Sequence, residues 1–195
     1  MRTLKPESTP KIMMLRLAAA LLLCVLLATV ATAQHRPSRE AMARTTERIT
    51  RQVRHELLML PWYSVFDNLE FRVQGSTVML TGQVIHGSLK SGAERAARRV
   101  EGVERVENRI EILPPFSSDD RIRAAVYRAI YSQTGFTKYA IQPVPPIHII
   151  VRAGRVMLAG VVDNETDRNL AYIAASGVPG TFEVTNHLRV ERAGK

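Results

Sequence analysis

The densest group of acidic residues in this sequence is Asp163, Glu165 and Asp167. Carboxylates grouped in this way could serve as the general acid and base of a hydrolase. The same residues stand at the expected start of a helix, where acidic side chains are favoured by the positive end of the helix dipole. The sequence has no phosphate-binding loop, nucleophile elbow or deaminase motif. We therefore predict that the protein is not an enzyme, and we keep hydrolysis at these carboxylates as the alternative.

Histidine is the other residue type here that could do chemistry. No two of the five histidines are three or four residues apart, the spacing that would bring two of them to one helix face. His148 and His187 would approach each other if the first and last strands of the C-terminal half pair. Two histidines without a nearby carboxylate or thiol make a poor zinc site. We expect no metal, no cofactor and no small-molecule substrate.

The N-terminal residues have the pattern of an export signal. Lys11 and Arg16 precede an apolar run over residues 17–30, and Ala31-Thr32-Ala33 has the small residues of a cleavage site. The run is too short for a membrane-spanning helix of about 20 residues. We predict that residues 1–33 are a signal peptide, cleaved after Ala33, and that the protein is periplasmic. Three methionines are candidates for the true start: Met1, Met13 and Met14.

Cysteine and charge limit the possible classes further. The single cysteine, Cys24, lies in the apolar run, and the bulky Leu23 before it argues against lipidation. The net charge of +9 includes four basic residues and one acidic residue of the leader, which leaves +6 for the exported chain. This balance favours weak attraction to an anionic membrane surface over nucleic-acid binding, which needs a concentrated basic face.

The rest of the chain consists of two copies of one sequence repeat. Val78-Met79-Leu80-Thr81-Gly82-Gln83-Val84 recurs as Val156-Met157-Leu158-Ala159-Gly160-Val161-Val162, and the offset of 78 residues holds to the end of the repeat. Positions kept in both copies are mainly apolar residues and glycines, as expected for residues that hold a fold. We predict two domains, at residues 40–113 and 117–193.

The spacing of apolar residues predicts the same order of helices and strands in each repeat. Ile49, Val53 and Leu57 follow a helical stripe, and the alternating residues of 69–73 and 78–84 predict a hairpin. A second helix is expected over residues 88–100 and a last strand over residues 106–112. The order α-β-β-α-β predicts the α+β class, with a small mixed three-stranded sheet and two helices on one face of each domain.

The first helix of the second repeat, expected over residues 119–132, breaks the register. Ile122, Val126 and Ile130 match Ile49, Val53 and Leu57 at an offset of 73, so five extra residues precede the second hairpin. They fall within residues 135–146, where the prolines of residues 141–146 exclude helix and central strand.

The repeated pattern resembles the BON domain of bacterial envelope proteins, and a leader with two such domains is similar to periplasmic proteins of the OsmY type. The motif is Val-x-Leu-x-Gly-x-Val, then Gly, then Val-x-Asn, and its marker residues are Gly82, Gly102, Asn108, Gly160, Gly180 and Asn186. The sequence departs from it at Pro179-Gly180-Thr181, which replaces Glu101-Gly102-Val103. The resemblance implies modules without catalytic residues, which bind phospholipid or other hydrophobic ligands and support envelope integrity or osmotic and stress protection.

In a double-BON lipoprotein of this family, the first helix of the second domain makes the membrane contact. The resemblance therefore places the candidate site on residues 119–132 and the adjoining loop, with Trp62 as a further exposed aromatic. The predicted surface comprises Arg121, Arg123, Tyr127, Arg128, Tyr131, Phe136, Lys138 and Tyr139.

Other interpretations remain open from the sequence. The helix face could be ordinary solvated surface with Tyr127 or Tyr131 half-buried, and Trp62 could cap a core. An envelope protein or a peptidoglycan-associated partner is the alternative to an anionic phospholipid surface, because free sheet edges can accept a partner strand. The sequence does not decide between these ligands, and it does not define the oligomeric state.

Overall fold

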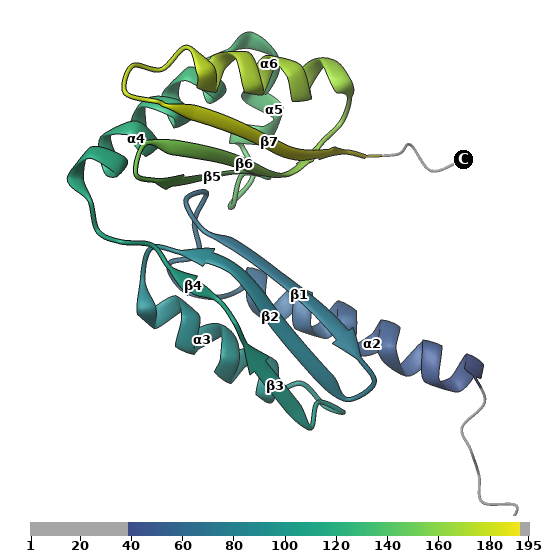
Figure 1. Cartoon of the computed structure of the whole chain (residues 1–195). Coiled ribbons are helices and arrows are strands. Elements are labelled where there is room, and N and C mark those ends of the chain that lie inside the picture. The colour runs from purple at the N-terminus through teal and green to yellow at the C-terminus, as the bar shows by residue number, and fades with distance from the viewer. Residues whose placement is uncertain (1–38, 192–195) are drawn as a thin grey trace, which may run out of the picture. The chain divides into compact units, whose positions relative to one another are not determined.

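The first repeat folds as a helix, a hairpin, a second helix and a broken final strand. The structure, a computed structural model, describes residues 39–191, and the predicted signal peptide lies outside them. The elements of this repeat are α2 (Arg39–Leu58), β1 (Asn68–Gln74), β2 (Thr77–Val84), α3 (Gly87–Arg98), β3 (Arg105–Asn108) and β4 (Glu111–Ile112). Both helices cover one face of the sheet (Figure 1).

The sheet of the first repeat is mixed. β2 pairs antiparallel with β1 and parallel with both β3 and β4. The single strand predicted over residues 106–112 is therefore wrong in detail, because it divides around Arg109 and Ile110. Arg109 N still donates to Leu80 O at 2.8 Å, which keeps the interrupted segment beside β2. Ile49, Val53 and Leu57 of α2 are buried against this sheet, as their spacing predicts.

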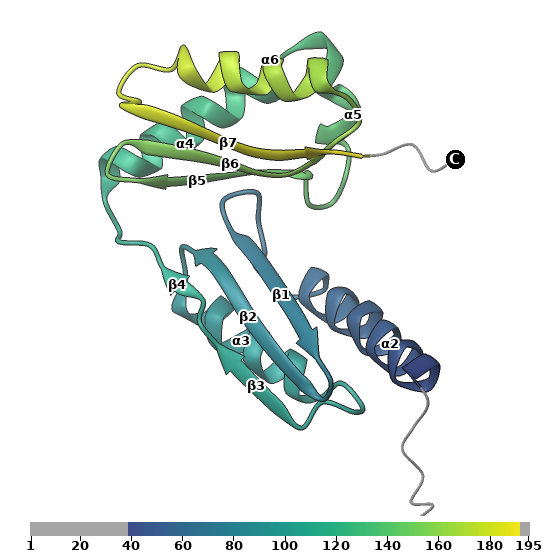
Figure 2. The same cartoon turned by 45° about the vertical axis from the view of Figure 1, so that its right-hand side comes forward.

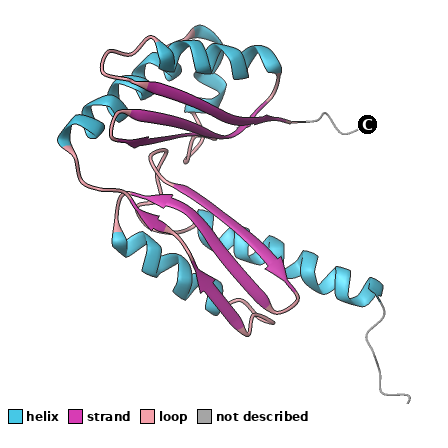
Figure 3. Cartoon of the chain, viewed as in Figure 1, coloured by secondary structure: helices cyan, strands magenta, loops and turns pink. Residues whose placement is uncertain are grey.

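The second repeat retraces the same order with one insertion. Its elements are α4 (Ser117–Tyr131), η1 (Thr134–Phe136), α5 (Thr137–Ala140), β5 (Ile147–Arg152), β6 (Arg155–Val162), α6 (Glu165–Ser176) and β7 (Glu183–Val190). The strand order is β5-β6-β7, antiparallel and then parallel. Figures 2 and 3 show α4 and α6 on one face of this sheet. The predicted α+β class and the α-β-β-α-β order are confirmed.

The inserted segment is more regular than its prolines suggest. Only residues 141–146 lack helix or strand, as predicted, whereas η1 and α5 occupy the residues before them. Phe136 and Tyr139 from these short helices join the core formed by α4, α6 and the sheet. Burial of two aromatic side chains explains why the insertion is ordered against the domain.

The motif asparagines and glycines have structural roles in both copies. Asn108 Nδ2 donates to Lys90 O at 3.0 Å, and Asn186 Nδ2 donates to Arg168 O, also at 3.0 Å. The side chains thereby tie β3 to α3 in the first repeat and β7 to α6 in the second. Gly82 and Gly160 adopt φ values of 109° and 121°, and a Cβ at either would lie within about 2 Å of a backbone oxygen.

The connector between α2 and β1 packs into the core of the second repeat. Val65 is buried there, Phe66 packs beside it, and Ile149 N donates to Val65 O at 2.8 Å. Asp67 fixes the connector from the other side, since its fully buried carboxylate accepts from Ile85 N and from Ser64 N and Oγ. Both repeats belong to one compact unit of the chain, which begins at Met42.

Candidate functional site

Four residues of the predicted binding surface are buried, so their assignment to an outer face is wrong. Arg123, Tyr131, Phe136 and Tyr139 are exposed by 2, 9, 0 and 3%. Arg123 lies beneath α4, where Nη2 donates to Val151 O at 2.7 Å and Nη1 pairs with Asp120. A buried guanidinium that already has these partners is not available to lipid phosphate.

The two buried tyrosines are tied to backbone or carboxylate groups. Tyr131 Oη donates to Ile147 O at 3.0 Å, and burial raises the pKa of this phenol. Tyr139 Oη donates to Asp167 Oδ2 at 2.6 Å and accepts from Asp163 N at 2.8 Å. Its pKa is raised too, by burial and then by the Asp167 bond. Both phenols therefore hold the fold of the second repeat.

Lys138 is engaged by the acidic group that the sequence offered for hydrolysis. Its ammonium lies 2.8 Å from Asp167 Oδ2 and also pairs with Asp163. Burial works to raise the pKa of Asp167, but the bonds from Lys138 and Tyr139 outweigh it and hold that pKa below its usual value. Asn164 caps α6 in the same cluster by accepting from Asp167 N. The carboxylates of this cluster thus anchor α5 to the start of α6.

Arg121, Tyr127, Arg128 and Trp62 remain at the surface to different degrees. Arg121 and Arg128 are exposed, and neither forms an ion pair with any residue between 39 and 191. Tyr127 is half-buried between Phe66 and Tyr131, with ring centroids 6.2 and 4.8 Å away. Trp62 does not cap a core, because it is 83% exposed and its φ is 67°.

An apolar groove of about 1140 Å³ lies beside α4. Its prominent side chains are Phe116 and Phe182, which are 51% and 83% exposed. Arg121 and Arg128 border it, and its remaining walls include Ala124, Ala125, Ala153 and Pro179. We call the set Phe116, Phe182, Arg121 and Arg128 the α4 groove cluster.

Hydrogen bonds and close packing fix the walls of this groove. Asp119, at the start of α4, accepts from Ala153 N at 2.8 Å and from Gly154 N at 3.0 Å. Phe182 N donates to Gly154 O at 2.9 Å, and the Phe182 ring lies so close that a Cβ on Gly154 would sit 2.4 Å from it. The β5–β6 turn therefore supports both α4 and Phe182.

Phe116 and Phe182 lie outside the predicted helix face, but the comparison of the two repeats distinguishes them. Phe182 corresponds to Glu104 at the offset of 78, and Phe116 corresponds to Ala43 at the offset of 73. An aromatic residue at an exposed position where the other copy has a charge or a small side chain marks a difference that the fold does not require.

His148 and His187 do not approach each other, because the first and last strands of the second repeat do not pair. β6 lies between β5 and β7, and His148 and His187 both stand opposite Ala159. Two strand spacings separate their backbones by about 10 Å. Across residues 39–191 there is no group of three or more histidine, cysteine, aspartate or glutamate residues that could hold a metal ion. His148 instead stacks on Tyr63, with ring centroids 5.6 Å apart.

The fold and the groove together define a duplicated α+β module. The chain belongs to the BON domain family, whose model matches residues 29–114 and again residues 118–192. This confirms the predicted family and the tandem arrangement. No curated protein matches the chain.

Two solved structures of CdsD, a structural protein of the type III secretion system of Chlamydia trachomatis, are similar to this chain. The C-terminal domain of CdsD is 11% identical, with 73% of this chain and 96% of that chain covered and a TM-score of 0.30. The second structure is also 11% identical, covers 72% and 90%, and has a TM-score of 0.28. Within residues 39–191, no helix has the length and apolar content to cross a membrane.

Proposed function

We propose that the protein is a periplasmic, non-enzymatic BON protein that binds anionic phospholipid surfaces and supports the envelope under osmotic or other stress. The observation that carries the proposal is the α4 groove cluster, in which two exposed phenylalanines lie beside two arginines without an ion pair within the described chain. Membership in a non-catalytic, envelope-associated family supports the same conclusion.

The mechanism uses two additive interactions at one surface. Arginine binds phosphate with its planar guanidinium, and each basic residue near an anionic leaflet contributes about 1 kcal/mol before screening. A phenylalanine transferred from water into the acyl boundary contributes roughly 1.5–3 kcal/mol. Phe116 and Phe182 would supply the apolar part, and Arg121 and Arg128 the electrostatic part. Trp62, exposed on the connector, is a second candidate contact.

Vesicle flotation tests the electrostatic part. The protein is expected to float with vesicles containing phosphatidylglycerol, to float less with phosphatidylcholine alone, and to be released by salt. The Arg121→Ser, Arg128→Ser double variant should lose the anionic preference. Its matched control is the Arg95→Ser, Arg99→Ser variant, which removes two exposed arginines of the first repeat outside the cluster.

Either of two outcomes would contradict the proposal. One is equal recovery of the wild-type protein with both vesicle types. The other is an equal loss of binding in the two arginine variants, because net charge alone would then account for the interaction.

A further inference from the structure

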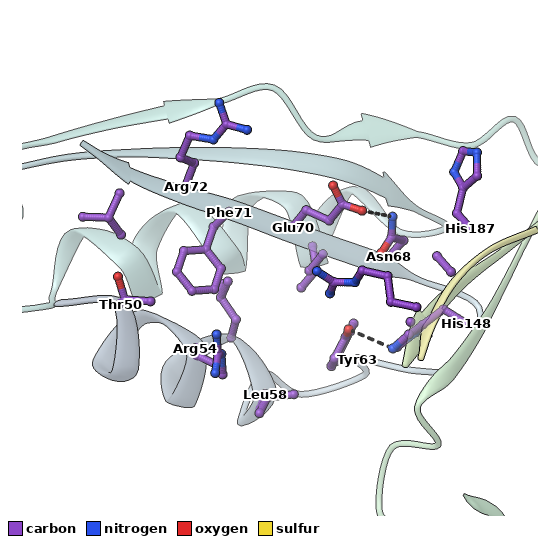
Figure 4. Close-up of a pocket in the computed structure, with 16 residues that line it drawn as sticks. Thr50, Arg54, Leu58, Tyr63, Asn68, Glu70, Phe71, Arg72, His148 and His187 are labelled. Atoms are coloured by element: carbon purple, nitrogen blue, oxygen red, sulfur yellow. Dashed lines mark hydrogen bonds between the residues drawn. The ribbon is translucent and has the colours of Figure 1, made fainter. Parts of the chain in front are cut away.

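A second open groove, of about 650 Å³, runs along the free edge of the first sheet. Within residues 39–191, β1 pairs with β2 alone, so its outer edge has no strand partner. Every residue from Asn68 to Val73 lines the groove, and α2 forms its other wall with Thr50, Arg54 and Leu58. Figure 4 shows Phe71 reaching from β1 towards the part of α2 that carries Thr50 and Arg54.

The equivalent place in the second repeat is filled by a segment of the chain itself. There, Val65 and Phe66 of the connector pack between β5 and α4 as part of the core, with the Phe66 ring 6.2 Å from that of Tyr127. Tyr127 corresponds to Arg54 at the helix offset of 73. In the second repeat, this kind of groove therefore accepts a pair of apolar residues, which the chain presents at a turn closed by the bond from Asp67 N to Ser64 O.

The backbone contact in the filled groove has an open counterpart in the first repeat. Ile149 N donates to Val65 O at 2.8 Å. Ile149 stands opposite Leu158, and Phe71 stands opposite Leu80 at the same register, 78 residues earlier. Because N–H groups alternate in direction along an antiparallel strand, the Phe71 N–H points away from β2, as that of Ile149 points away from β6.

Charge and apolar surface define the occupant. Leu57, Leu69 and Phe71 contribute apolar surface to the groove, and Leu69 and Phe71 are only partly buried. Arg54, Arg72 and Arg189 line the same groove without an ion pair inside the described part of the chain, and Glu70 is its single acidic lining residue. The groove thus combines an unpaired strand edge, an apolar floor and an excess of positive charge.

We propose that this groove binds an extended polypeptide segment of a partner protein, in which apolar residues alternate with acidic ones. The segment adds to β1 as a further strand, and the Phe71 N–H donates to one of its carbonyls. Its apolar side chains enter between α2 and β1, and its acidic side chains project from the opposite face towards Arg72. Arg54 adds positive charge on the α2 wall of the groove. This surface is distinct from the α4 groove cluster and does not depend on membrane binding.

Hydrogen exchange of the full chain with a defined probe tests the proposal. The probe is an acetylated octapeptide that alternates valine with aspartate, and its counterpart has lysine in place of aspartate. The aspartate peptide should slow exchange of the Phe71 and Val73 amides and leave those of β5 unchanged. The lysine peptide should slow neither set.

Charge reversal provides a second measurement in a chain with an unaltered backbone. The Arg54→Glu, Arg72→Glu variant should bind the aspartate peptide at least roughly tenfold more weakly and gain binding of the lysine peptide. The Arg95→Glu, Arg99→Glu variant, with the same change in net charge outside the groove, should behave as wild type. Binding unaffected by the Arg54 and Arg72 reversal would overturn the proposal.

Two further outcomes would also overturn it. One is the absence of protection at Phe71 and Val73 with either peptide. The other is protection that appears without peptide and grows with protein concentration, which would assign the edge to a second copy of this chain.

Discussion

Gly160 and its counterpart Gly82 meet a requirement of the hairpin that no side chain can satisfy. Gly160 has a φ of 121°, and a Cβ there would lie 1.8 Å from Pro146 O. The repeat shows this without any structure, since a glycine kept between drifting polar neighbours marks a backbone constraint. The motif asparagines are a similar case, because both bind a carbonyl of the preceding helix.

Gly160→Ala is expected to lower the free energy of unfolding by about 2–4 kcal/mol, because β6 must move away from Pro146 and weaken its pairing with the start of β5. Urea unfolding followed by circular dichroism measures this. Gly135→Ala is the control, since no atom lies within 4 Å of its added Cβ, and it should change stability by no more than about 0.5 kcal/mol. Equal stability of the two variants would remove the proposed constraint.

Side-chain type misled the sequence-based prediction of the site. Arg123 and Tyr131 each adjoin a core residue of α4, Ile122 and Ile130 respectively. A helix that lies flat on a sheet buries the margins of its apolar stripe, and long side chains there reach backbone carbonyls. Hence Arg123 reaches Val151 O and Tyr131 reaches Ile147 O. Only the packed structure distinguishes these positions from Arg121 and Arg128.

At the scale of elements, the insertion is the main difference between the repeats, and α5 is its anchor. The change of offset predicts where the insertion lies, but it does not predict the short helices within it. The nearby prolines indicate irregular structure, and nothing in the local sequence indicates that Phe136 and Tyr139 are buried. The Tyr139 hydroxyl donates to Asp167 and accepts from Asp163 N, which links α5 to the start of α6.

Tyr139→Phe removes both hydrogen bonds and keeps the ring. We expect the variant to lose about 1–3 kcal/mol of unfolding free energy, measured in urea at pH 7, because Asp167 loses one hydrogen bond in a buried site and Asp163 N loses its acceptor. Tyr172→Phe, on the exposed face of α6, is the matched control and should be neutral. A neutral Tyr139→Phe would mean that α5 is held by apolar packing alone.

The same cluster gives an acid dependence. The folded pKa of Asp167 lies below its unfolded value of about 3.9, despite the opposing effect of burial, because Lys138 and Tyr139 bind the carboxylate. Its contribution is therefore present above about pH 4 and is lost as the pH falls through the folded pKa. The Asp167→Asn variant should lose less of its free energy of unfolding between pH 4 and 2 than the wild type does. An unchanged dependence of stability on pH would contradict the lowered pKa of Asp167.

For the molecule as a whole, the duplication predicts the tandem arrangement and the α+β class, but it does not predict which distant residues come together. The spacing of apolar residues and the offset between the repeats predict α6 and the hairpins, because such elements depend mainly on local sequence. Phe116 and Phe182 are far apart in the sequence, but the fold brings them to the same groove. Val65 packs into a core whose other residues begin more than 50 positions later. Such long-range packing leaves no periodic trace in the sequence.

The contact between Tyr63 and His148 predicts a pH effect on the whole fold. Burial lowers the pKa of His148 against the upward influence of Asp67, and burial also raises the pKa of Tyr63 to about 12. The unfolded imidazole takes up a proton near pH 6.5, before the folded one does. Stability is therefore complete above about pH 6.5 and declines as the pH falls towards the folded pKa.

His148→Phe preserves a ring against Tyr63 and cannot titrate. The difference in melting temperature between pH 7.5 and 5.5 should be smaller in this variant than in wild type. His187→Phe, at an exposed histidine of the same sheet, is the control and should retain the wild-type difference. An identical pH response in the wild type and His148→Phe would contradict a buried neutral imidazole.

The most direct test of membrane binding through the α4 groove cluster is the depth of Phe182 in a bilayer. Trp62 is the single tryptophan, so a Trp62→Phe, Phe182→Trp variant places one fluorophore at the cluster, and Trp62→Phe, Ile173→Trp places it on the exposed side of α6. With anionic vesicles carrying brominated acyl chains, membrane binding through the cluster should give a blue shift and quenching at position 182 and neither at position 173. Unshifted, unquenched emission at position 182 from protein that has bound the vesicles would contradict it.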